Sequence, residues 1–178
     1  MLYSVLYVLT DSRGVSPSRC LTMYSVVDAT IFIVAILANL LMIGIFLAKV
    51  RGLARLEYGL GIVLEALALP LCVAAALNLL WGRPWWTVAL PLAMVAFLVV
   101  ELLFDYVWKL DFRRGRLLGP YLALYYVGMI ALTGYAFSLG KPYGLAALAA
   151  YFANLAAAGY SYSRVGHGSG PLMPPRRG

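Results

Sequence analysis

Glu101, Asp105 and Lys109 are charged residues whose spacing could support acid–base chemistry. They follow one another at intervals of four, which places their side chains along one stripe of a helix. The segment 86–108, which carries the two acids and ends just before Lys109, is otherwise almost entirely apolar, and a charge in the middle of a bilayer costs roughly 2.5–3.5 kcal/mol. Lys109 is near enough to pair with Asp105, whereas Glu101 lies one turn farther into the segment. Glu101 is therefore the acid that most needs a partner or a function.

A second acid, Glu65, stands at a matching depth in the apolar segment 58–80. Counted from Tyr58 and from Trp108, Glu65 and Glu101 both lie about 10–11 Å inside the membrane boundary. Two tyrosines of another apolar segment reach nearly the same level, and two asparagines lie about one turn deeper. The sequence therefore predicts one polar layer, and the candidate ligand or proton site comprises Glu65, Glu101, Asp105, Asn39, Tyr125, Tyr126 and Asn154.

Two interpretations of this polar layer stay open. If Glu65 and Glu101 face each other, burial and like-charge repulsion both favour a proton shared between them. The layer would then bind protons or cations and open to the cytoplasm. In the alternative, the carboxyl groups are hydrogen-bonded to the tyrosines and asparagines and only hold the helices together.

The candidate site residues lie on five apolar segments, each close in length to the roughly 20 residues that cross a bilayer. They are residues 26–48, 58–80, 86–108, 117–139 and 143–163. Their short connections make successive helices antiparallel neighbours. The composition agrees, because 63% of residues are hydrophobic and only 12% are charged, against about 25% charged in soluble domains. We therefore predict an all-α, multi-pass protein of the cytoplasmic membrane, folded as one five-helix bundle.

Basic residues predict the orientation of this bundle. Of the 14 Lys and Arg residues, ten lie in the first and third connections and the C-terminal tail, and four lie at the opposite ends of the segments. The positive-inside rule then predicts an external N-terminus and a cytoplasmic C-terminus. Residues 1–24 are predicted to be a flexible external tail, with Met23 as an alternative start of synthesis. Residues 164–178 are predicted to be a disordered cytoplasmic tail.

Two prolines are predicted to disturb the helices. Pro70 removes the hydrogen bond to the Ala66 carbonyl, and Pro91 removes the one to the Thr87 carbonyl. Each kink leaves a carbonyl acceptor that could line a cavity. In the alternative, the kink is only a tolerated bend.

The remaining residue types exclude several classes of protein. Two cysteines and one histidine are too few for a disulfide framework or a multi-histidine metal site. The sequence contains no phosphate-binding loop, nucleophile elbow or zinc-binding helix motif. We therefore predict no metal, no cofactor and no catalytic residue, and an enzyme is disfavoured. Nucleic-acid binding is excluded, because topology already explains the basic residues.

The predicted partners are the lipid bilayer, including anionic lipid head groups, and either further copies of this chain or a larger membrane complex. The leading functional hypothesis is a small transport-type protein with a cytoplasm-facing carboxylate site. The alternative is an accessory or assembly subunit of a membrane complex, whose buried acids are purely structural. A third hypothesis is a membrane enzyme that acts on a lipid.

Overall fold

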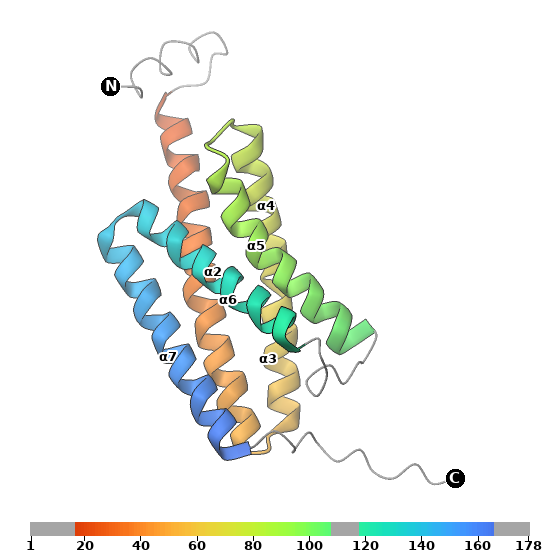
Figure 1. Cartoon of the computed structure of the whole chain (residues 1–178). Coiled ribbons are helices and arrows are strands. Elements are labelled where there is room, and N and C mark those ends of the chain that lie inside the picture. The colour runs from red at the N-terminus through yellow and green to blue at the C-terminus, as the bar shows by residue number, and fades with distance from the viewer. Residues whose placement is uncertain (1–16, 108–117, 166–178) are drawn as a thin grey trace.

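The computed structural model describes residues 17–107 and 118–165, with side chains for 24–104 and 119–164. These ranges are helical apart from short turns (Figure 1). The helices are α2 (Pro17–Val50), α3 (Ala54–Ala66), α4 (Ala68–Leu80), α5 (Trp86–Glu101), α6 (Leu118–Leu139) and α7 (Lys141–Val165). A π-helical segment, η2 (Leu102–Val107), continues α5. The prediction of an all-α fold is confirmed.

The stretch Ala54–Leu80 is divided into two helices, α3 and α4, by a break at Leu67. The Leu67 N–H donates to the Leu64 carbonyl at 3.0 Å, which is the tighter spacing of a 3₁₀ turn. Pro70 follows in the first turn of α4 and has no N–H to donate to the preceding turn. The kink predicted from Pro70 is therefore found as a break just before it.

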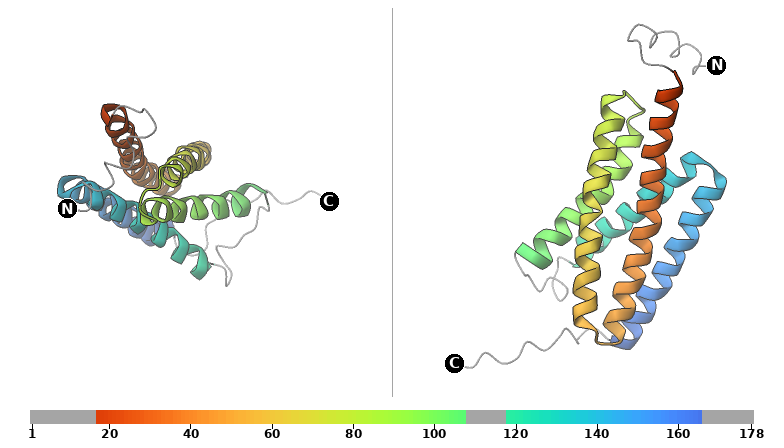
Figure 2. Two further views of the ribbon diagram at one scale, coloured as in Figure 1. Left: turned by 90° about the horizontal axis from the view of Figure 1, so that it is seen from above. Right: turned by 180° about the vertical axis from the view of Figure 1, so that it is seen from behind.

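Helix α2 lies at the centre of the bundle. It packs against α3, α4, α6 and α7, whereas α5 packs against α3, α4 and α6. Figures 1 and 2 show α6 running obliquely across the other helices. Gly52 and Gly82 occupy the two turns that follow α2 and α4, with φ of 68° and 64°, where a side chain would be strained. These tight turns make the helices they join antiparallel neighbours.

The bundle has two ends, which we name by a residue at each. The Arg83 end comprises the first turns of α2, the turn between α4 and α5, and the end of α6. The Lys49 end comprises the turn between α2 and α3 and the end of α7 (Figure 1). Between the two ends lies an apolar core, whose fully buried side chains include Ile31, Val34, Leu71, Met94, Met129 and Leu132.

Four helical stretches within the described ranges are long and apolar enough to cross a membrane. They are Tyr24–Val50, Ala54–Leu80, Trp86–Phe104 and Gly119–Leu139. Large apolar side chains point outward from the bundle, among them Leu69, Val73, Leu80 and Trp85. So much exposed apolar surface fits lipid rather than water as the surrounding medium. The protein is therefore a multi-pass membrane protein.

The fifth predicted span, 143–163, corresponds to α7, which is a long helix but is not among these four stretches. Eight of its 25 residues are alanine and only three are leucine, and tyrosine, serine, glycine and Asn154 are among the others, so its apolar character is weaker than that of leucine-rich helices. At the other end of the chain, α2 begins at Pro17. Residues 17–24, predicted as part of a tail, are thus helical, while 1–16 and 166–178 lie outside the described residues.

Candidate functional site: two polar clusters in the bundle

Three of the predicted site residues meet in the interior. The Asn154 amide nitrogen Nδ2 donates to the Tyr125 hydroxyl at 2.6 Å and to Asn39 Oδ1 at 3.1 Å. The Asn39 nitrogen Nδ2 in turn donates to the Ala35 carbonyl at 2.8 Å. All three side chains are buried. We call Asn39, Tyr125 and Asn154 the amide cluster, and it links α2, α6 and α7.

One acceptor of the amide cluster is unused. Asn154 Oδ1 is buried and has no hydrogen-bond partner within the part of the chain that the structure describes. A buried polar atom without a partner costs about 1–3 kcal/mol, and most such atoms in proteins are satisfied. The cluster is therefore ready to accept a hydrogen bond or to coordinate a cation.

Glu101 lies on the face of α5 that packs against this cluster. Phe97, one turn earlier on the same face, stacks edge-on against Tyr125 with ring centroids 5.4 Å apart. Glu101 is close enough to the Tyr125 hydroxyl to interact with it electrostatically, and its Oε2 is buried. It is also the last residue of α5 before the π-helical turns of η2, a distortion that is rare and frequent at functional sites.

The structure places the other predicted site residues around this centre. Tyr126 stacks on Tyr125 with ring centroids 5.1 Å apart, but its side chain is 37% exposed and faces outward. Glu65 is half-buried on α3, which packs against α5, and its shared proton with Glu101 stays a prediction. Asp105 belongs to η2, but its side chain lies outside the described ones, as does Lys109, so their predicted pairing is not described.

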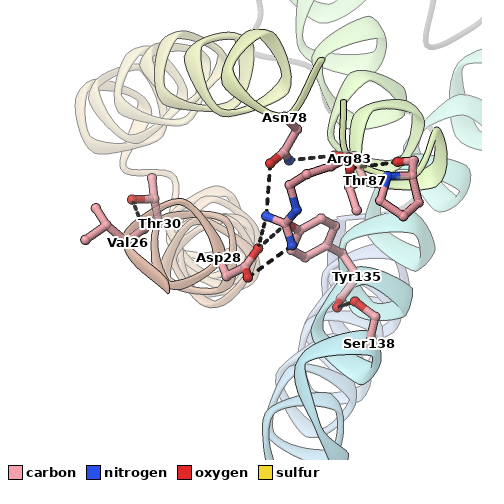
Figure 3. A network of polar contacts seen from close by, with 9 residues as sticks. Val26, Asp28, Thr30, Asn78, Arg83, Thr87, Tyr135 and Ser138 are labelled. Carbon is pink, nitrogen blue, oxygen red and sulfur yellow. Dashed lines mark hydrogen bonds and ion pairs between the residues drawn. The ribbon is translucent and has the colours of Figure 1, made fainter. Parts of the chain in front are cut away.

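A second polar cluster lies at the Arg83 end. The Arg83 guanidinium donates to both oxygens of the Asp28 carboxylate, with Nη1 to Oδ1 at 2.7 Å and Nη2 to Oδ2 at 3.2 Å. The Tyr135 hydroxyl donates to the same Oδ1 at 2.6 Å. Figure 3 shows the three side chains converging from α2, the turn after α4, and α6. We call Asp28, Arg83 and Tyr135 the carboxylate cluster.

Neighbouring groups hold Arg83 from its other sides. Its Nη1 also donates to Asn78 Oδ1 at 3.0 Å, and its guanidinium lies 5.4 Å from the centre of the Tyr24 ring, within cation–π range. Burial lowers the pKa of Arg83, but the hydrogen bonds and charges of Asp28 and Tyr135 more than offset this and raise the pKa above its ordinary value. The guanidinium therefore stays charged.

Asn78 also explains how Pro91 is accommodated. The Thr87 carbonyl, which Pro91 leaves without its helical donor, accepts a hydrogen bond from Asn78 Nδ2 at 2.9 Å. This acceptor therefore serves to fix α4 against α5, rather than to line a cavity.

Sequence reasoning missed the carboxylate cluster. Asp28 stands only two residues inside the predicted span 26–48, and Arg83 was weighed only as a basic residue of a loop. An acid within a span and an arginine at the same membrane boundary are a signal for an ion pair. Tyr135 carries no such signal, because a tyrosine near a helix end is equally typical of the membrane interface.

Comparisons with protein-family models, with curated proteins and with solved structures give no match for this chain. A proposal for its function therefore depends on the chemistry of the two clusters. The amide cluster and Glu101 offer amide, phenol and carboxylate oxygens, which suit a proton or a hard cation. Within the described residues no three histidine, cysteine, aspartate or glutamate side chains gather as a metal site would require.

Proposed function

We propose that this protein is a small transport-type membrane protein, in which the amide cluster and Glu101 bind a proton or a small cation. The observation that carries the proposal is the buried Asn154 Oδ1, which has no hydrogen-bond partner among the described residues. A cluster that served only to join helices would be expected to use this acceptor. A protonated carboxyl, a hydrated proton or a cation would satisfy it.

The proposal includes α7 as a fifth membrane span. Helix α7 has 25 residues, which at 1.5 Å per residue exceeds the roughly 30 Å of a hydrocarbon core. Between Pro142 and Gly159 its exposed side chains are all apolar, namely Tyr143, Leu145, Ala146, Ala149, Phe152, Ala153 and Ala156. Its polar Asn154 is instead buried against α2 and α6. A helix that hides its amide and exposes apolar side chains is suited to lipid.

The proposed orientation has the Lys49 end in the cytoplasm and the Arg83 end outside. Lys49, Arg51, Arg55 and Arg164 lie at the Lys49 end, and cytoplasmic loops carry an excess of such residues. Asn39 lies nearer to Val50 than to Tyr24 along the first span. The amide cluster is therefore nearer to the cytoplasmic side, from which the ion would enter. The same basic residues would contact anionic lipid head groups.

A second candidate function is an accessory or assembly subunit of a membrane complex. The observation that favours it is the pair of hydrogen bonds at 2.6 and 3.1 Å by which Asn154 joins three helices. Interhelical hydrogen bonds of this kind stabilise membrane bundles without any ligand. Under this candidate, Glu101 is structural and the protein functions only with its partners. The lipid-acting enzyme gains no such observation and is not proposed.

A flux measurement separates the two candidates. The purified protein is placed in liposomes, and an enclosed pH dye reports proton or cation-coupled proton movement under an imposed gradient. We expect flux through the wild-type protein and its loss in Glu101→Gln, with unchanged thermal stability. Glu57→Gln, which neutralises a half-buried acid at the Lys49 end, is the matched control and should retain flux. Absence of flux from the wild type, with every variant folded, would reject transport and leave the subunit.

A further inference from the structure

The two clusters lie at two separate levels of the bundle. Along α2, Asp28 and Asn39 are separated by about 16 Å, and along α6, Tyr135 and Tyr125 are separated by about 15 Å, at 1.5 Å per residue. Both helices thus give nearly the same separation between the carboxylate cluster and the amide cluster. The space between the levels is filled by buried apolar side chains, namely Ile31, Val34, Leu71, Met94, Met129 and Leu132. Water that reaches the carboxylate cluster must pass this apolar section to reach the amide cluster.

Hydrogen bonds at the Arg83 end converge on a single acceptor. Asp28 Oδ1 receives Arg83 Nη1 at 2.7 Å and the Tyr135 hydroxyl at 2.6 Å. Arg83 also holds Asn78 on α4, and Asn78 holds the Thr87 carbonyl on α5. One carboxylate therefore connects α2, α4, α5 and α6 at this end (Figure 3).

The Asp28–Arg83 pair is also placed where it can be released. The side chains of Arg83 and Asp28 are 19% and 21% exposed, so water and salt compete for the pair. Arg83 lies in the turn between α4 and α5, so it can withdraw without unwinding a helix. The amide cluster, by contrast, is formed by buried residues in the middle of helices.

We infer that Asp28, Arg83 and Tyr135 form a clasp that closes the Arg83 end of the bundle against water, and that breaking the Asp28–Arg83 ion pair opens this end. Opening this end would let water reach the nearer edge of the apolar section, whether or not the amide cluster binds a proton or a cation.

Cysteine accessibility tests the clasp. In a background with Cys20 and Cys72 replaced by alanine, Ala75→Cys places a thiol on α4, one turn from Asn78 and on the Arg83 side of Leu71, at a position that is 3% exposed. The protein is held in lipid nanodiscs, where both ends are accessible, and is treated with a charged thiosulfonate reagent. We expect slow labelling with the clasp intact. Asp28→Asn or Arg83→Gln should accelerate labelling at least about ten-fold, equal to about 1.4 kcal/mol in the closing equilibrium.

Three controls keep the result specific. Lys141→Gln removes an exposed positive charge near the same end and should leave the labelling rate unchanged. Tyr135→Phe removes one hydrogen bond to Asp28 but keeps the ring, so its rate should be intermediate. The exchanged pair Asp28→Arg with Arg83→Asp restores the attraction and should restore slow labelling.

The clasp is overturned if labelling of Ala75→Cys is equally fast with and without the ion pair. It is also overturned if a second reporter, Ala38→Cys, next to Asn39 and below the apolar section, gains the same factor, because the whole bundle would then have loosened. These outcomes are separate from the flux measurement. A wild-type protein without flux would reject the proposed transport and would leave the labelling difference intact.

Discussion

Asp28 and Arg83, 55 residues apart in the chain, form an ion pair in which guanidinium Nη1 contacts carboxylate Oδ1 and Nη2 contacts Oδ2. Such two-point pairing fixes the orientation of both groups as well as their distance. Because Asp28 lies on α2 and Arg83 lies after α4, the pair holds the C-terminal end of α4 against α2. The turn between α4 and α5 is thereby anchored to α2.

The stability of the protein should depend on this pair in a non-additive way. Arg83→Gln leaves the Asp28 carboxylate without its counter-charge, and we expect the free energy of unfolding to fall by about 1–3 kcal/mol. The fall should be near the lower figure, because water partly screens the pair. Asp28→Asn should cost a similar amount. The double variant should cost clearly less than the sum of the two. Thermal unfolding in detergent measures all three, and strict additivity would show that the two residues do not interact.

Adjacent tyrosines on α6 provide a matched test of the amide cluster. Tyr125→Phe removes the oxygen that accepts a hydrogen bond from Asn154 Nδ2 at 2.6 Å. We therefore expect the free energy of unfolding to fall by about 1 kcal/mol. Tyr126 is exposed, and Tyr126→Phe should change stability by no more than about 0.5 kcal/mol. Equal effects of the two substitutions in a thermal unfolding experiment would contradict the cluster.

Two glycines of α6 should respond in opposite ways to alanine. A Cβ added at Gly128 would lie 3.2 Å from both the Cα and the Sδ of Met94, and the backbone of α5 cannot move aside cheaply. Gly128→Ala should therefore cost about 1–3 kcal/mol. A Cβ at Gly134 meets nothing within 4 Å, so Gly134→Ala should be neutral or stabilise the helix by up to about 1 kcal/mol. The reverse order of thermal stabilities would show that α5 and α6 do not approach each other at Gly128.

Glu65 and Glu101 should act as one unit if they share a proton. Glu65→Gln and Glu101→Gln should then each abolish flux, and the double variant should be no worse than either single one. If Glu65→Gln retains full flux while Glu101→Gln loses it, Glu101 works with the amide cluster alone.

The helices were predictable because apolar length and charge placement are properties of the sequence itself. The segment 26–48 lies wholly inside α2, and 117–139 matches α6 to within one residue at its start. Asn39, Tyr125 and Asn154 were predicted to lie within about one turn of the same depth, which made their meeting expected. Depth alone does not determine which side of a helix faces inward, and for that reason Tyr126 was grouped with Tyr125 although it faces outward.

The carboxylate cluster was not predictable in the same way. Its bonds join residues 55 and 107 positions apart, and their meeting depends on how α6 crosses α2. The segment 143–163 was predicted to be apolar enough to span a bilayer, but its tyrosine, serine, glycine and asparagine residues lower its mean hydropathy, and α7 is not among the four spanning stretches.

The most direct test of the proposed function is the protonation of Glu101, followed by infrared difference spectroscopy from about pH 5 to about pH 9. We expect a protonated carboxyl band that titrates in this range, that is absent from Glu101→Gln and that shifts in Asn154→Leu, because Asn154 bonds to the Tyr125 hydroxyl with which Glu101 interacts. Glu57→Gln should leave the band unchanged. A wild-type protein with no titrating carboxyl band, or a band that survives in Glu101→Gln, would contradict the proton site and favour a purely structural layer.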